Sequence, residues 1–199
     1  PADKIITYTI LFENMPEADT PASVVTVTDT LPEELDMRRF RLGEFAFGDT
    51  VVEGPDNSPF FSETMQLDSG MVLRVSGGIS PANRTARWEF RTIDPLTGEE
   101  PQNPNMGFLP QNTYLVDENG DPVYVTDEEG EVVNQTDEDG NVVEDEDGNP
   151  VPMRKKTGVG EGRVTFTITP AKGIEDGTAI ENGATIVFDT NEAIVTNKT

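Results

Sequence analysis

The 199-residue chain contains no cysteine and no histidine. It therefore folds without disulfides, and it lacks every catalytic arrangement that pairs a serine or cysteine nucleophile with histidine. The usual zinc sites, which need cysteine or histidine ligands, are excluded as well. The GxxxxGK[ST] and GxGxxG loops that hold nucleotide phosphates are also missing. These absences leave carboxylates as the main side chains with which the protein can do chemistry.

Basic residues and long apolar segments are also scarce. Lys and Arg number 14 against 38 Asp and Glu, which gives a formal net charge of −24. Nucleic acids and anionic membrane surfaces are bound through basic side chains, so we expect neither as a partner. No apolar run approaches the ~18 residues of a transmembrane helix, and we expect no membrane insertion. The excess of carboxylates favours cations as ligands, or it serves only to keep the surface solvated.

What the sequence does contain is a repeated alternation of apolar and polar residues. Val164, Phe166 and Ile168 alternate with polar residues, and a second run over 184–188 does the same. A period of two predicts strands with one face on a core and the other in water. The same pattern predicts further strands over 4–13, 22–30, 41–49, 60–68, 71–77 and 86–94.

The spacing of these strands indicates the fold class. Strands recur about every 10–15 residues, and only 32–40 reads as a short helical turn, so we predict an all-β, Ig-like Greek-key β-sandwich. One face of each strand should supply its core. We expect the following side chains to be mostly buried: Ile6, Tyr8, Ile10, Phe12, Val25, Val27, Trp88, Phe90, Val164, Phe166, Ile168, Ile186 and Phe188.

Residues 113–157 differ from everything around them. They contain 14 acidic and three basic residues, and glycines at 120, 130, 140 and 148 mark units of ten and then eight residues. Each unit is an acidic glycine-containing turn followed by valine or similar residues, which is a hairpin signal. We therefore predict a sandwich module over 1–112 plus 158–199, with 113–157 inserted as acidic β-hairpins. Partial disorder of the insertion is the alternative, because its hydrophobicity is low.

The segments outside the insertion resemble a known kind of module. ITYTILFEN, VVTVTDTLPEELD, FRLGEFAFGD, WEFRTIDPLTG, GFLPQN, GEGRVTFTITP and IENGATIVFDTNEAIVTN together are similar to a repeat of large bacterial secreted and cell-surface proteins. That repeat is related to conserved-repeat domains of unknown function with a YTI…N…VTDTLP pattern. The resemblance implies an Ig-like sandwich in an adhesin-like tandem array outside the cell. It implies no catalytic residues, and it does not extend to the acidic insertion.

Oxygen ligands in the insertion recur at the spacing of a calcium loop. The first set begins like Asp-x-Asn-x-Asp, and Glu128 falls at the twelfth position, where a bidentate glutamate would sit. Pro122, however, stands where the loop needs glycine. The insertion therefore either binds Ca²⁺ or consists of solvated acidic hairpins. The sets are Asp117/Asn119/Asp121, Asp127/Glu129/Glu131, Asp137/Asp139/Asn141 and Asp145/Asp147/Asn149.

A second set of candidate calcium ligands lies at predicted strand ends. Asp94 precedes Pro95, and Asp189 and Asn191 follow the last long strand. Carboxylates on converging loops make weak calcium sites between extracellular modules. The alternative is that these residues cap turns by bonding their own backbone two residues on. Asp29, in the VTDTLP segment, is a weaker candidate ligand.

Three functional hypotheses follow, of which the last belongs to a different class. The leading hypothesis is a structural or adhesive extracellular module of a bacterial surface protein, tuned by calcium, whose partners are neighbouring modules or identical subunits. The first alternative is a filament subunit whose segment 192–199 completes a neighbour's sheet. The second is a hydrolase with two carboxylates about 5–10 Å apart in a cleft. A cross-link from Lys4 to Asn182 or Asn197 is a further possibility.

Overall fold

The computed structural model describes residues 4–55, 58–137, 139–175 and 177–198. The chain forms two compact units, Pro1–Gln111 with Val159–Thr199, and Asn112–Gly158. We call the first unit the sandwich and the second unit the arm. Each is described by itself.

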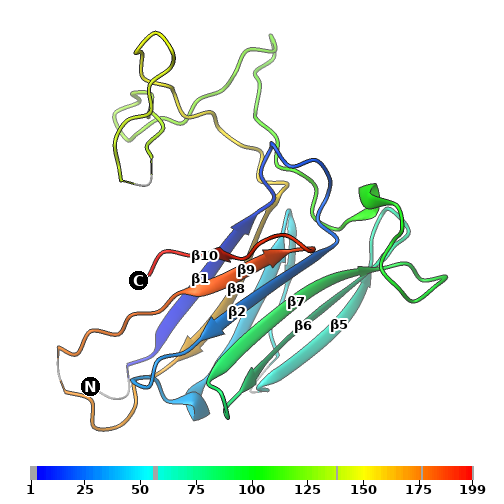
Figure 1. The fold of residues 1–199 in the computed structure, drawn as a ribbon, viewed down its shortest axis with the longest axis vertical. Helices are drawn as coiled ribbons and strands as arrows, with labels where there is room; N and C mark the ends of the chain where they lie inside the picture. Colours follow the sequence, from blue (N-terminus) through cyan, green and yellow to red (C-terminus); the bar gives the residue numbers. More distant parts are fainter. Residues whose placement is uncertain (1–3, 56–57, 138, 176, 199) are drawn as a thin grey trace. The chain divides into compact units, whose positions relative to one another are not determined.

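The sandwich consists of two antiparallel sheets (Figure 1). One has the strand order β1-β8-β3-β4 and the other the order β10-β9-β2-β7-β6-β5. The predicted all-β sandwich class is therefore confirmed. The strands are β1 (Ile6–Glu13), β2 (Val24–Thr30), β3 (Arg41–Phe47), β4 (Thr50–Val52), β5 (Phe60–Gln66), β6 (Val72–Ser80), β7 (Thr85–Ile93), β8 (Glu161–Ile168), β9 (Ala184–Phe188) and β10 (Ile194–Val195).

Strands β8 and β2 lie inside their sheets and hold the core together. β8 pairs with β1 on one side and β3 on the other, and β2 pairs with β7 and β9. The inward residues of the two sheets meet in an aromatic cluster. The Trp88 ring of β7 lies 5.6 Å from the Phe166 ring of β8, which also stacks on Phe40 at 5.2 Å. Because Trp88 and Phe166 come from opposite sheets, their contact fixes the two layers face to face.

The expected core residues are buried except at one end of β1. Ile6 and Tyr8 are half-buried, although the Tyr8 ring stacks on Phe166 at 5.0 Å. β1 is an edge strand that pairs with β8 alone, so less of the structure covers it. The short strand β4 was not expected, because three residues carry no readable alternation, whereas β10 lies within 192–199, the segment that the filament hypothesis treats as a strand.

Helical structure is limited to short turns. Within the described ranges it comprises the 3-10 helices η1 (Met37–Arg39) and η2 (Pro104–Met106), and none of the helices is long and apolar enough to cross a membrane. Of the helical turn expected over 32–40, only the three residues of η1 are helical. Its cap is Asp36, whose carboxylate accepts the backbone N–H of Arg38 at 3.1 Å.

The arm is built from stacked rings of backbone hydrogen bonds. In the first ring Leu115 donates to Lys155, Lys155 to Val123 and Val123 to Leu115, over N···O distances of 2.8, 2.8 and 3.1 Å. From one ring to the next, the first two members each lie ten residues later in the sequence. The third member, which comes from the returning segment 151–155, lies two residues earlier. The side chains of the rings are half-buried or exposed. The other two rings join Val125, Val133 and Met153, and Gln135, Val143 and Val151.

Candidate functional site

The most unusual polar group in the sandwich is Asp29, near the end of β2. Val25 and Val27 precede it on the face of β2 that points into the core, and Asp29 continues that face. Its partners across the sheet are Ala86 and Ala184, whose methyl side chains offer its carboxyl group no hydrogen bond. Asp29 is fully buried, with 0% of its surface exposed. A carboxyl group in such a place needs a polar partner.

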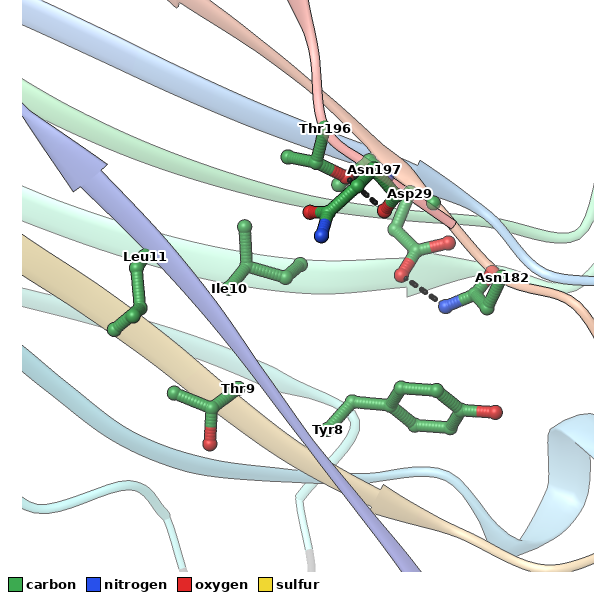
Figure 2. Close-up of a pocket in the computed structure, with 10 residues that line it drawn as sticks. Tyr8, Thr9, Ile10, Leu11, Asp29, Asn182, Thr196 and Asn197 are labelled. Atoms are coloured by element: carbon green, nitrogen blue, oxygen red, sulfur yellow. Dashed lines mark hydrogen bonds between the residues drawn. The ribbon is translucent and has the colours of Figure 1, made fainter. Parts of the chain in front are cut away.

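Asn182 supplies one such partner. It lies two residues before β9, on the same side of the chain as the inward residue Ala184, and it is 6% exposed. Its Nδ2 donates to Oδ2 of Asp29 at 2.7 Å (Figure 2). Among the described residues, Oδ1 of Asp29 and Oδ1 of Asn182 have no hydrogen-bond partner. Two buried acceptor oxygens therefore remain unsatisfied in the same place.

Both residues line a pocket of about 170 Å³ at the side of the sandwich. Its walls come from the edge strand β1, from the segment entering β9 and from the chain that follows β10. Figure 2 shows Tyr8 of β1 and Thr196 on different sides of the Asp29 carboxyl group. The remaining lining residues are Thr9, Ile10, Leu11, Gly183, Ala184 and Asn197.

Burial controls the electrostatics of this pocket. It raises the pKa of Asp29 to about 6, and the hydrogen bond from Asn182 opposes that rise only in part. The pKa of Tyr8 is raised as well, first by burial and then by the negative charge of Asp29. Removing a charged carboxylate from water is unfavourable unless another group compensates for it. At neutral pH the pocket thus holds a negative charge that its described surroundings satisfy only partly.

Asp189 and Asp94 both accept backbone N–H groups through their carboxylates, but only Asp94 does so within its own turn. Oδ1 of Asp189 accepts the backbone N–H groups of Ser23 and Val24 at 2.9 and 2.8 Å, and so ties the end of β9 to the start of β2. Its φ of 50° lies in the left-handed region, which Asp tolerates better than most residues. Asp94 similarly accepts the backbone N–H of Leu96 at 2.8 Å, and Asn191 donates its backbone N–H to Phe188.

The first aspartate of every turn in the arm is also a cap. Oδ1 of Asp117 accepts the backbone N–H groups of Asn119 and Asp121 at 2.8 and 2.9 Å. The bonds at i+2 and i+4 recur in the other turns, so the spacing read as a set of metal ligands is also the spacing of an Asx turn. The later capping residues and their donors are Asp127 with Glu129 and Glu131, Asp137 with Asp139 and Asn141, and Asp145 with Asp147 and Asn149.

Hydrogen bonding lowers the pKa of three of these capping aspartates, whereas burial raises the pKa of Asp29. Backbone and side-chain donors lower the pKa of Asp117, Asp137 and Asp145, for Asp137 chiefly the side-chain amide of Asn141. Glu128 lies exposed in the second turn, directly after its capping aspartate, as Glu118 does in the first. Within the described ranges, no group of three acidic side chains is placed to hold a metal ion. Calcium binding stays a prediction.

The segments named in the alternative hypotheses have defined places. Ile194 and Val195 pair with Ile186 and Thr185 of their own chain, so this part of 192–199 already belongs to a sheet. Lys4 lines a surface pocket beside Ile180, whereas Asn182 lines the pocket around Asp29. Asp29 is the one acidic residue among the described residues lining that pocket, while the hydrolase hypothesis needs two facing carboxylates.

Sequence reasoning overlooked the pairing of Asp29 with Asn182, although a signal was present. Asp29 continues the every-second-residue pattern of Val25 and Val27. Asn182 stands at the same spacing from Ala184 and Ile186. Both polar residues therefore fell on faces that the alternation assigns to the core. What the alternation could not give is that β2 and β9 are neighbours in register, which brings the two side chains together.

Comparison with known proteins adds one finding. A family model described as a domain of unknown function (DUF7619) matches residues 148–199, which include the return segment of the arm, β8, β9 and β10. The match covers Asn182 and Asp189 but not Asp29. No curated protein and no solved structure matches the chain.

Proposed function

We propose that this chain is a structural module of a bacterial surface protein, in which the sandwich is a spacer and the arm makes contacts tuned by calcium. The observation that carries this proposal is the construction of the arm. Its capping carboxylates accept backbone N–H groups, so the densest cluster of charge in the chain is also its turn scaffold. A segment organised in this way is suited to present a surface.

The exposed glutamates support a contact-making role. Glu118, Glu128 and Glu146 each follow a capping aspartate directly, and all three are exposed. The repeat thus sets a similar carboxylate directly after the capping aspartate in the first, second and fourth turns. Like charges at repeated positions repel one another, and a divalent cation or a basic partner would relieve that repulsion. Hard oxygen ligands favour Ca²⁺ over softer metals.

A melting experiment tests the calcium part of the proposal. A ligand that binds only the folded form stabilises it by RT ln(1 + [L]/Kd), so ~10 mM Ca²⁺ at a Kd of ~0.1 mM contributes about 2.7 kcal/mol. We expect a higher melting temperature with Ca²⁺, reversed by chelator and much smaller with Mg²⁺. Unchanged melting in Ca²⁺ and chelator would refute calcium tuning.

Two variants separate the candidate calcium sites. Deleting 113–157 should abolish the calcium effect if the arm binds the ion. Asp189→Asn should abolish it if the strand end does, because this change removes the charge and keeps an oxygen that accepts the backbone N–H groups of Ser23 and Val24. An effect that survives both changes would place the ion elsewhere.

The free edge of β1 favours a second function, assembly by strand addition. β1 pairs with β8 on one side only, and Ile5 and Leu11 beside that edge are 67% and 68% exposed. Unpaired backbone groups on an edge strand are a template for a strand from another chain. Proline substitution at Thr9 should weaken such assembly, which sedimentation of the concentrated protein in the analytical ultracentrifuge measures. Unchanged self-association would argue against strand addition at β1.

A further inference from the structure

Two buried oxygen atoms without partners define the pocket beside Asp29. Oδ1 of Asp29 and Oδ1 of Asn182 belong to side chains that are 0% and 6% exposed, and neither atom has a partner among the described residues. Buried polar atoms are almost always hydrogen-bonded, and an exception calls for an explanation. The pocket that both residues line gives these atoms room for an occupant.

The chemistry of these atoms defines the occupant. A carboxylate and an amide oxygen are both acceptors, so the occupant must donate hydrogen bonds to each. A buried carboxylate also favours a positive charge beside it. A primary ammonium group has three donors, no acceptor and a compact charge, and so meets both requirements.

The rest of the pocket fits an alkyl ammonium better than a metal ion. Calcium takes six to eight oxygen ligands, usually with several carboxylates, whereas Asp29 is the single acidic residue in the described lining. Ile10 and Ala184, which are both buried, instead offer apolar surface for a methylene chain. The chain's own Lys198, next to the lining residue Asn197, is not the occupant of the pocket. Its ammonium group is exposed and donates to Glu181 at 3.4 Å.

We propose that the pocket between β1 and β9 binds a primary ammonium group, held by Asp29 and Asn182. The site is separate from the acidic arm, and the proposal does not depend on the function proposed above. The raised pKa of Asp29 agrees with it, because burial leaves the carboxylate poorly compensated by the groups around it. The group belongs either to a small alkylamine or to a lysine side chain of an extended peptide.

The test follows the Asp29 carboxyl carbon by NMR in the whole, unmodified chain at pH 7. The probes are n-butylamine and the peptide acetyl-Val-Thr-Lys-Thr-Val-amide, each compared with a neutral analogue, n-butanol and the same peptide with norleucine for lysine. We expect saturable shifts with the amines and none with the neutral analogues. A response to butylamine alone assigns the site to small amines, and a response to both admits lysine side chains.

Matched variants complete the test. In Asp29→Asn, which lacks that carboxyl carbon, binding is followed through the backbone amide signals of the lining residues Gly183 and Ala184, as it is in the unmodified chain for comparison. Amine binding should weaken at least about tenfold, because the charge-assisted contact is lost. Asp94→Asn removes a carboxylate from an exposed turn and should leave binding unchanged. The proposal is overturned if neither amine binds, if lysine and norleucine peptides bind alike, or if Asp29→Asn binds as tightly as the unmodified protein. Saturation by Ca²⁺ in place of the amines would also overturn it.

Discussion

The sandwich and the arm are held together in different ways. The sandwich buries aromatic rings such as Trp88 and Phe166, which are 0% exposed, between two sheets. In the arm the ring-forming side chains stay half-buried or exposed, and backbone hydrogen bonds and aspartate caps define its shape. One chain thus combines a fold driven by the hydrophobic effect with one determined by local turn chemistry. The two units should respond differently to the same kind of change.

Aspartate illustrates the difference most directly. In the sandwich, burial raises the pKa of Asp29 to about 6. In the arm, Asp137 is fully exposed and accepts two backbone N–H groups, and its pKa is lowered. The same side chain is therefore unfavourable when ionised in one unit and favourable when ionised in the other. Environment, not residue type, decides the sign.

The largest expected effect comes from truncating a ring in the core. Phe166→Ala should lower the free energy of unfolding by about 3–5 kcal/mol, because it leaves a cavity beside Tyr8, Phe40 and Trp88. The change in the arm, Val133→Ala, truncates a half-buried side chain and should cost less than about 1 kcal/mol, and less than the same truncation of the buried Val164 in the sandwich. Denaturant unfolding measures all three. Equal losses from the two valine variants would mean that the arm has a core of its own.

The next effect is a dependence on pH from Asp29. Its pKa is about 6 in the folded protein and about 3.9 when unfolded, so the folded state binds more protons between these values. The contribution of Asp29 to the free energy of unfolding is fully present below about pH 4. It is lost as the pH rises through about 6, a decrease of roughly 3 kcal/mol. Asp29→Asn should remove the dependence and stabilise the protein at pH 7. Urea unfolding of the arm-deleted protein across pH 4–7 measures this.

The arm should respond to acid in the opposite direction. The lowered pKa values of Asp117, Asp137 and Asp145 mean that their stabilising effect is present above their unfolded pKa and is lost as pH falls through the folded values. Amide hydrogen exchange in the turns should therefore gain protection as pH rises from 2 to 5, after correction for intrinsic rates. Turns whose protection is independent of pH would show that the caps contribute little.

A smaller effect is expected from the hydrogen bonds by which Asp189 connects the end of β9 to the start of β2. Asp189→Ala removes an acceptor for two backbone N–H groups and places alanine at a φ of 50°, and should cost roughly 1–3 kcal/mol. Asp189→Asn retains an acceptor oxygen and suits the left-handed conformation, so it should cost less than half as much. Thermal melting distinguishes the two. Equal losses would assign the effect to charge alone.

The smallest effect on the sandwich should come from removing the arm altogether. Thr157 N donates to Thr113 O at 2.8 Å, so the two ends of the arm are adjacent and a short link can replace 113–157. The sandwich core cluster contains no residue of that segment among those described, and we expect a melting temperature within a few degrees of the full chain. A deleted protein that does not fold would show that the arm is needed for the sheets to form.

The sequence by itself determined the all-β class, the main strands and most of the core, because alternation with a period of two is a local property. The repeated glycines and acidic turns of 113–157 are likewise a local pattern that the sequence shows directly. Tertiary structure alone decided that β2 lies beside β9, and thereby that Asp29 meets Asn182 in a buried pocket. It also closed the arm into rings from residues as far apart as Leu115 and Lys155. Strand neighbours depend on pairings between distant segments, which no local pattern encodes.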